Sequence, residues 1–169
     1  MATDIKDLYA TALRNTRAEE LQGVHALSTQ LKGLDNYPDY ERVARRHLDA
    51  THGQIARLDA ALKAIGETPS TIKDTVTSAA GLVGAAVHAV AGDETLKNLF
   101  AGYAYQHHQI AAYRSLIVLA EAAGQSAQVP EFRRTIEEEQ AGAEALSGLI
   151  ESVTRTYLGR ETGGAKADS

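Results

Sequence analysis

The chain has 169 residues, enough for one domain with a substantial core, and its 44% hydrophobic and 23% charged residues are typical of a folded protein. It has no cysteine, which excludes disulfide scaffolds and thiolate metal sites, and its formal net charge of −5 disfavours nucleic acid as a partner. The first residues lack the apolar core of a signal peptide, and the most apolar stretch, 79–91, is too short to span a bilayer. We therefore expect a soluble, cytoplasmic protein.

Apolar residues recur at helical spacing in four long segments. The first covers about residues 4–33, and the second begins at Pro38 and ends before Gly66. The third is predicted to begin with Asp93 as its N-cap and to end at Gly124. The fourth runs from about residue 130 to about 158.

The link between the second and third segments is long, and it carries its own helical pattern over about residues 70–91. One long crossover of this kind is found in ferritin-like bundles. We therefore predict an all-α, ferritin-like four-helix bundle over residues 1–159, with an additional crossover helix. Residues 160–169 are polar and glycine-rich, and they are predicted to form a disordered tail.

Polar side chains occupy several positions on the predicted inner faces, where an unpaired charge is costly to bury. They fall near the middle of their helices, so they can meet at one level of the bundle. The candidate metal ligands are Glu20, Gln54, Gln106, His107 and Glu139. The corresponding cofactor prediction is either no metal or a single weakly bound transition metal, Fe or Mn.

Two interpretations of these residues stay open. Carboxylate-bridged di-metal bundles take a Glu-x-x-His pair from each of two helices, and no helix here supplies an inward pair. Asp49-x-x-His52 has similar letters but falls away from the predicted inner face. The same groups could instead form a hydrogen-bonded or ionic network, for example Glu20 or Glu139 with Arg114 or His107.

Four stretches resemble the YciF stress-protein family, a ferritin-like group of poorly defined function. They are LRNTRAEELQ (13–22), HLDATHGQIARLD (47–59), HHQIAAYRSL (107–116) and RTIEEEQAGAEAL (134–146). The resemblance covers roughly residues 8–149. It implies a ferritin-like bundle, usually a homodimer, with a di-metal centre built from inward carboxylates.

The resemblance matches acids of this family to Glu20, to Asp49 and to the run 137–139, in which the helical pattern selects Glu139. The other positions hold uncharged residues: Ala50, Gln106, Gln109 and Ala143. A two-metal site needs several anionic ligands to balance about four positive charges. The resemblance together with these replacements implies a lost or reduced centre.

We therefore predict a stress-associated structural or binding module, with no catalytic residue assigned. The alternative is a di-metal or mononuclear oxidase, or a peroxide-handling enzyme, that uses Glu20 and Glu139. Iron storage would also require a hollow shell of many subunits, and nothing in the sequence indicates one.

Overall fold

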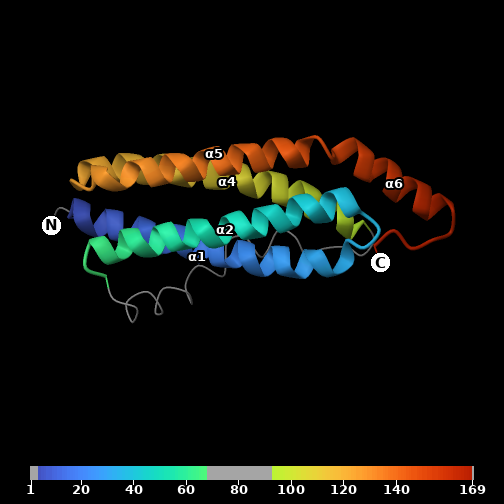
Figure 1. Cartoon of the computed structure of the whole chain (residues 1–169), viewed down its shortest axis with the longest axis horizontal. Helices are drawn as coiled ribbons and strands as arrows, with labels where there is room; N and C mark the ends of the chain where they lie inside the picture. The colour runs from blue at the N-terminus through green and yellow to red at the C-terminus, as the bar shows by residue number, and fades with distance from the viewer. Residues whose placement is uncertain (1–3, 68–92, 169) are drawn as a thin grey trace.

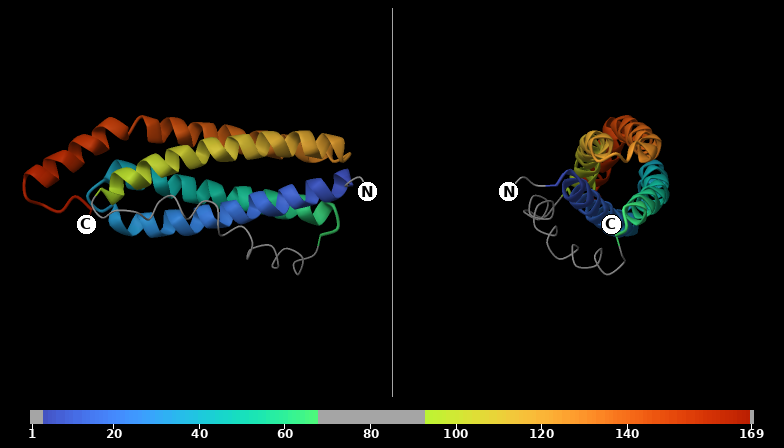
Figure 2. Two further views of the ribbon diagram at one scale, coloured as in Figure 1. Left: turned by 180° about the vertical axis from the view of Figure 1, so that it is seen from behind. Right: turned by 90° about the vertical axis from the view of Figure 1, so that its left-hand side faces the viewer.

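The computed structural model describes residues 4–67 and 93–168. Its α-helices are α1 (Ile5–Gln30), α2 (Pro38–Ala64), α4 (Glu94–Ala122), α5 (Val129–Ser147) and α6 (Ile150–Thr162), and its 3-10 turns are η1 (Leu31–Gly33) and η2 (Ser126–Gln128). The four long helices α1, α2, α4 and α5 surround one axis (Figures 1 and 2). The predicted all-α four-helix bundle is confirmed, while the predicted crossover helix lies outside the described residues.

The order of the helices is that of a bundle with one long connection. The pairs α1–α2 and α4–α5 are antiparallel, whereas α2 and α4 run in the same direction, so α2 ends at the opposite end of the bundle from the start of α4 (Figure 1). This arrangement is the one found in ferritin-like folds. Within the described residues, no helix is long and apolar enough to cross a membrane.

The buried apolar side chains form two clusters at different levels of the bundle. One cluster is built from Tyr9, Leu13, Leu58, Ala61, Leu62, Tyr113, Leu116, Ile117, Ala120, Val129 and Phe132. The other is built from Leu27, Leu34, Tyr37, Tyr40, Val43, Ala44, Leu99, Leu146 and Val153. Between them, all four helices place polar side chains inward, and we call these six residues the polar layer: Glu20, His47, Gln54, Gln106, Gln109 and Glu139.

The last predicted helix, 130–158, is divided in the structure into α5 and α6. The break falls at Gly148 and Leu149, where the Leu149 amide bonds to the Leu146 carbonyl, three residues back rather than four. Glycine is a weak helix former, and a local change in the hydrogen-bond ladder bends a helix. As a result α6 leaves the direction of α5 (Figure 1), and Val153 is its only buried residue.

The carboxyl-terminal residues differ from the predicted disordered tail. α6 continues to Thr162, and the chain then returns to the end of the bundle (Figure 1). Ala167 is completely buried, and its carbonyl accepts a 2.9 Å hydrogen bond from the Tyr37 hydroxyl. Composition alone could not reveal this, because a few specific hydrogen bonds hold the segment.

Asp168 caps α4, the function that the sequence had suggested for Asp93. Its carboxylate accepts hydrogen bonds from the backbone nitrogens of Asp93, at 3.0 Å, and of Thr95, at 2.9 Å. Asp93 has a left-handed backbone (φ 83°), and its own side chain forms an ion pair with Lys97 instead. The first amides of a helix need such acceptors, because they have no partner within the helix.

We predict that Asp168→Ala lowers the melting temperature. Loss of a capping carboxylate costs about 0.5–2 kcal/mol, which corresponds to a shift of roughly 1–8 °C in a domain of this size. Asp35→Ala is the matched control, because Asp35 is exposed and should tolerate the change. Equal melting temperatures for the two variants in calorimetry would show that the cap does not stabilise the fold.

Candidate functional site

The polar layer lies at the middle of the bundle, between the two apolar clusters. Glu20, Gln54, Gln106, Gln109 and Glu139 are at most 1% exposed, and His47 is 9% exposed. The helical repeat explains the arrangement, because residues three or four apart share one face. Gln106 and Gln109 therefore both point inward from α4.

On the α2 and α5 side, the layer is a series of polar contacts that extends to Gln106 on α4. Gln54 donates its amide to Glu139 Oε1 at 2.7 Å, and His47 Nε2 lies 3.5 Å from the same oxygen. His47 Nδ1 is 3.0 Å from the Gln106 amide nitrogen. Because an amide nitrogen only donates, this orientation makes Nδ1 the acceptor and leaves the proton of the neutral ring on Nε2.

On the α1 and α4 side, each hydrogen bond of the layer involves a tyrosine hydroxyl. Tyr113 donates to Glu20 Oε1 at 2.9 Å. Gln109 donates to the Tyr105 hydroxyl at 3.0 Å, and Tyr105 in turn donates to the Glu19 carbonyl at 2.6 Å. Gly23 allows this approach, because a Cβ at that position would lie only 3.0 Å from the Tyr105 oxygen.

A second glycine makes room for the layer on α5. A Cβ added to Gly142 would lie 2.9 Å from the amide nitrogen of Gln106 and 3.0 Å from its amide oxygen. Glycine inside a helix costs about 1 kcal/mol relative to alanine, so a packing reason is expected for it. The glycine in this helix is the sequence signal that could have indicated the close approach.

Glu20 and Glu139 influence each other electrostatically. Burial, and after it the negative charge of Glu139, raises the pKa of Glu20 to about 8, although the hydrogen bond from Tyr113 opposes the shift. Burial disfavours the charged form of a carboxyl group, and a nearby like charge does so further. In the absence of a cation, Glu20 therefore keeps its proton at neutral pH.

Several acceptors in the layer lack a hydrogen-bond donor among the described residues. They are Glu20 Oε2, Gln54 Oε1, Gln106 Oε1, Gln109 Oε1 and Glu139 Oε2; the protonated His47 Nε2 beside them also makes no hydrogen bond. A buried acceptor without a partner costs about 1–3 kcal/mol. An inward-facing set of oxygen acceptors is suited to a proton or a cation.

Four of the five predicted ligands meet in this layer, and His107 does not. Its ring is exposed and packs edge-on against Tyr103, with 4.7 Å between the ring centroids. The predicted inner face of this helix was therefore wrong by about one position. α4 carries apolar residues on both faces, including exposed Phe100 and Val118, so its periodicity does not fix its orientation.

His47 and Gln109 join the layer in place of His107. Arg114, the predicted ionic partner, is exposed on the outer face of α4. Of the positions where the family resemblance implies a further acid, Gln106, Gln109 and Ala143 are buried and Ala50 is half-buried. The described residues contain no group of three or more His, Cys, Asp and Glu side chains that could hold a metal ion. A cation in this layer would therefore need amide oxygens as ligands.

Comparisons with known proteins agree with the sequence resemblance. A family described as a domain of unknown function (DUF892) matches residues 4–159. Protein YciF of Escherichia coli (strain K12) is 30% identical over 153 residues, which are 86% of this chain and 89% of that protein.

Solved structures share the bundle. The crystal structure of a protein from Xanthomonas campestris pv. campestris matches with a TM-score of 0.77 at 21% identity, covering 94% of this chain and 99% of the other. The crystal structure of the E. coli stress protein YciF matches with a TM-score of 0.66 at 24% identity, covering 88% and 96%. These matches confirm the predicted YciF-type bundle.

The raised pKa of Glu20 predicts a pH dependence of stability in metal-free protein. The folded chain keeps this proton up to about pH 8, whereas the unfolded chain releases it near the ordinary pKa of 4.5. The free energy of unfolding therefore falls as the pH rises between these two values. Glu20→Gln has no proton to lose, so it should become more stable relative to wild type as the pH rises.

Urea unfolding at about pH 5 and about pH 8, with a chelator present, measures this difference. Glu144→Gln is the control, because Glu144 is exposed on α5 and should keep the wild-type pH dependence. If Glu20→Gln also keeps the wild-type pH dependence, Glu20 is not the group that causes the pH dependence of stability.

Proposed function

We propose that this chain, which belongs to the DUF892 family, is a stress-associated structural bundle protein whose polar layer is a reduced metal centre for one divalent cation. The observation that carries the proposal is the burial of two carboxylates, Glu20 and Glu139, each with a free oxygen, among uncharged amide groups. The stress association is taken from the description of E. coli YciF as a stress protein.

The charge of the layer supports one cation rather than two. Glu20 and Glu139 supply two negative charges when both are ionised, which balances one divalent ion. Two such ions would leave two positive charges uncompensated in the interior, where an unpaired charge is very costly. The amides at Gln106 and Gln109 offer dipoles but no charge.

The donor chemistry supports a hard cation. The residues that would hold it are Glu20, Glu139, His47, Gln54 and Gln109, an oxygen-rich set with one imidazole and no thiolate. Carboxylate and carbonyl oxygens suit Mn²⁺ and Mg²⁺, and imidazole also suits iron. A bound ion of this kind would supply positive charge that links all four long helices.

Gln106 would then orient the His47 ring through Nδ1, while Nε2 faces the cation. Exchanging its amide oxygen and nitrogen would let the oxygen accept a hydrogen bond from Nδ1, leaving the Nε2 lone pair free for a cation. Histidine ligands commonly donate their second ring nitrogen in this way. The unpartnered Gln106 oxygen is positioned for this exchange, because the Gln106 amide already contacts the ring.

We predict that the wild-type chain, purified without a metal-affinity tag, binds one Mn²⁺ and melts at a higher temperature when Mn²⁺ is present. Binding to the folded state alone stabilises it by mass action. Glu139→Gln should lose most of this response, and exposed Glu144→Gln should keep it. Elemental analysis that finds two ions per wild-type chain, or none after dialysis against Mn²⁺, would contradict the proposal.

Restoring acids at the replaced positions should increase metal dependence. We predict that Gln106→Glu with Gln109→Glu destabilises the metal-free protein, because it adds two carboxylates to a buried layer. Mn²⁺ should recover about 2.7 kcal/mol at roughly 100-fold excess over the dissociation constant. Gln140→Glu, on the exposed face of α5, is the control. If Mn²⁺ does not change the melting temperature of the double variant, positions 106 and 109 do not belong to one cation site.

A further inference from the structure

Two arginines without a bound partner line the same cleft. The guanidinium groups of most arginines in the chain bind a carboxylate or a carbonyl, but within the part of the chain that the structure describes those of Arg46, Arg114 and Arg133 bind neither. Arg114 on α4 and Arg133 on α5 line a cleft of about 340 Å³, together with Ile117, Ile136, Glu137 and Gln140. Two positive charges are therefore available to a ligand in one place.

The cleft is a groove between the antiparallel helices α4 and α5. Its residues on α5 are three or four positions apart, so they share one face of that helix, as positions 114 and 117 do on α4. Ile117 is only 7% exposed and belongs to the first apolar cluster, against which the half-buried Ile136 packs. Both arginines are exposed. The cleft therefore has an apolar inner part and a charged rim.

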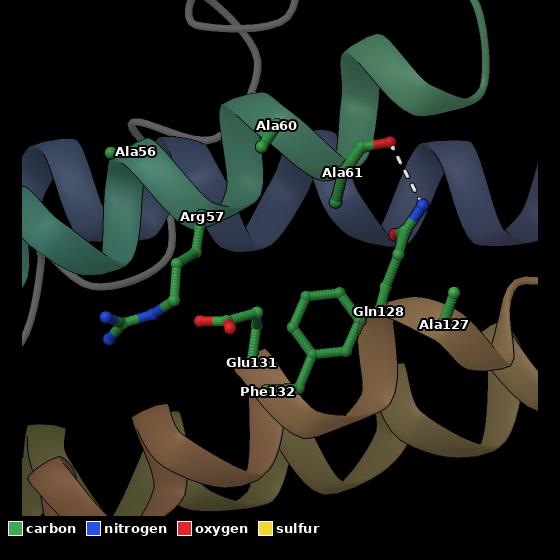
Figure 3. A pocket seen from close by; sticks show the side chains of 8 residues that line it. All are labelled: Ala56, Arg57, Ala60, Ala61, Ala127, Gln128, Glu131 and Phe132. Atoms are coloured by element: carbon green, nitrogen blue, oxygen red, sulfur yellow. Dashed lines mark hydrogen bonds between the residues drawn. The ribbon is translucent and has the colours of Figure 1, made fainter.

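Another cleft, between α2 and α5, differs in the state of its arginine. This cleft has a volume of about 350 Å³ and is lined mainly by alanines, and Arg57 extends from α2 toward α5 at one end of it (Figure 3). Arg57 donates to Glu138, beside the polar layer, and its Nε donates to the Thr135 hydroxyl at 3.1 Å. Its charge is thus neutralised by the protein, whereas the charges of Arg114 and Arg133 are not.

We propose that the cleft between α4 and α5 binds a small organic carboxylate, with its anionic group between Arg114 and Arg133. Guanidinium groups bind carboxylates through paired, charge-assisted hydrogen bonds. The volume of the cleft is within the range of roughly 300–1,000 Å³ that is typical of small-molecule sites. The two isoleucines favour a carboxylate that carries a hydrocarbon group over a bare inorganic anion, because the hydrocarbon gains by leaving water. This site is separate from the polar layer and does not depend on a bound cation.

Glu137 limits the charge of the ligand. It is exposed, lines the same cleft and follows Arg133 by four residues, so the two side chains share a helix face. Its negative charge offsets one of the two guanidinium charges, which leaves a net charge of +1. The cleft therefore suits a monocarboxylate, and Glu137 weakens the binding of any anion.

The test titrates metal-free, full-length protein with benzoate, benzamide and inorganic phosphate at low ionic strength, where screening is weak. Benzoate should shift the Nε–H nuclear magnetic resonance signals of Arg114 and Arg133, while benzamide, which lacks the charge, and phosphate, which lacks the apolar ring, should bind more weakly. Combining Arg114→Gln with Arg133→Gln should lower the benzoate affinity roughly tenfold or more, because each arginine contributes charged hydrogen bonds. Benzamide or phosphate binding as tightly as benzoate would overturn the proposal.

Arg46→Gln is the matched control for charge, because it removes an exposed, unpaired arginine on α2 outside the cleft. It should leave the benzoate affinity unchanged, and a loss equal to that of the double variant would also overturn the proposal.

A second variant tests the site in the opposite direction. Glu137→Gln removes the negative charge from the cleft, so benzoate should bind several-fold more tightly. Glu144→Gln makes the same change at an exposed position of α5 outside the cleft and should leave the affinity at the wild-type value. Because both positions are exposed, both variants should fold. Equal benzoate affinities for Glu137→Gln and Glu144→Gln would show that benzoate does not bind in this cleft.

Discussion

The structure depends on the burial of two carboxylates, Glu20 and Glu139, at one level of a four-helix bundle. Neither can be hydrated there, so the surrounding side chains must supply what water would have supplied. Tyr113 and Gln54 each donate a hydrogen bond to one of the acids, and the proton held by Glu20 removes one of the two charges. The neighbouring helices therefore place polar side chains at this level to supply hydrogen bonds to the two acids.

The two apolar clusters on either side of the polar layer offset the free-energy cost of burying it. They bury large side chains such as Tyr9, Phe132 and Tyr40, which supply the hydrophobic stabilisation that the layer lacks. The layer in turn restricts how the helices slide along one another. A shift of α5 by one turn would move Glu139 away from Gln54 and against apolar neighbours. Buried polar groups can define register in this way.

Much of the fold and part of the site could be predicted from sequence, for physical reasons that differ between elements. Glu20, Gln54 and Glu139 lie on helices that are more amphipathic than α4, so their burial follows from the helical period. α4 is apolar on several faces, and there the period could not separate Gln106 from His107. Asp168 capping α4 and Arg57 reaching Glu138 depend on side-chain contacts across the fold, which no local pattern records.

Glutamines, Gln106 and Gln109, stand at two buried positions of α4 where the family resemblance implies acids, and this bears on what the layer can do. A glutamine keeps the length and the oxygen of a glutamate, so Gln106 and Gln109 preserve the packing of α4 while removing charge. Two-metal redox chemistry requires enough negative charge to hold two ions side by side. The layer instead has two inner carboxylates and a guanidinium that neutralises a third. Under the proposed function, this charge would balance a single divalent ion linking the four helices, and it would not supply the two-metal centre of an oxidase.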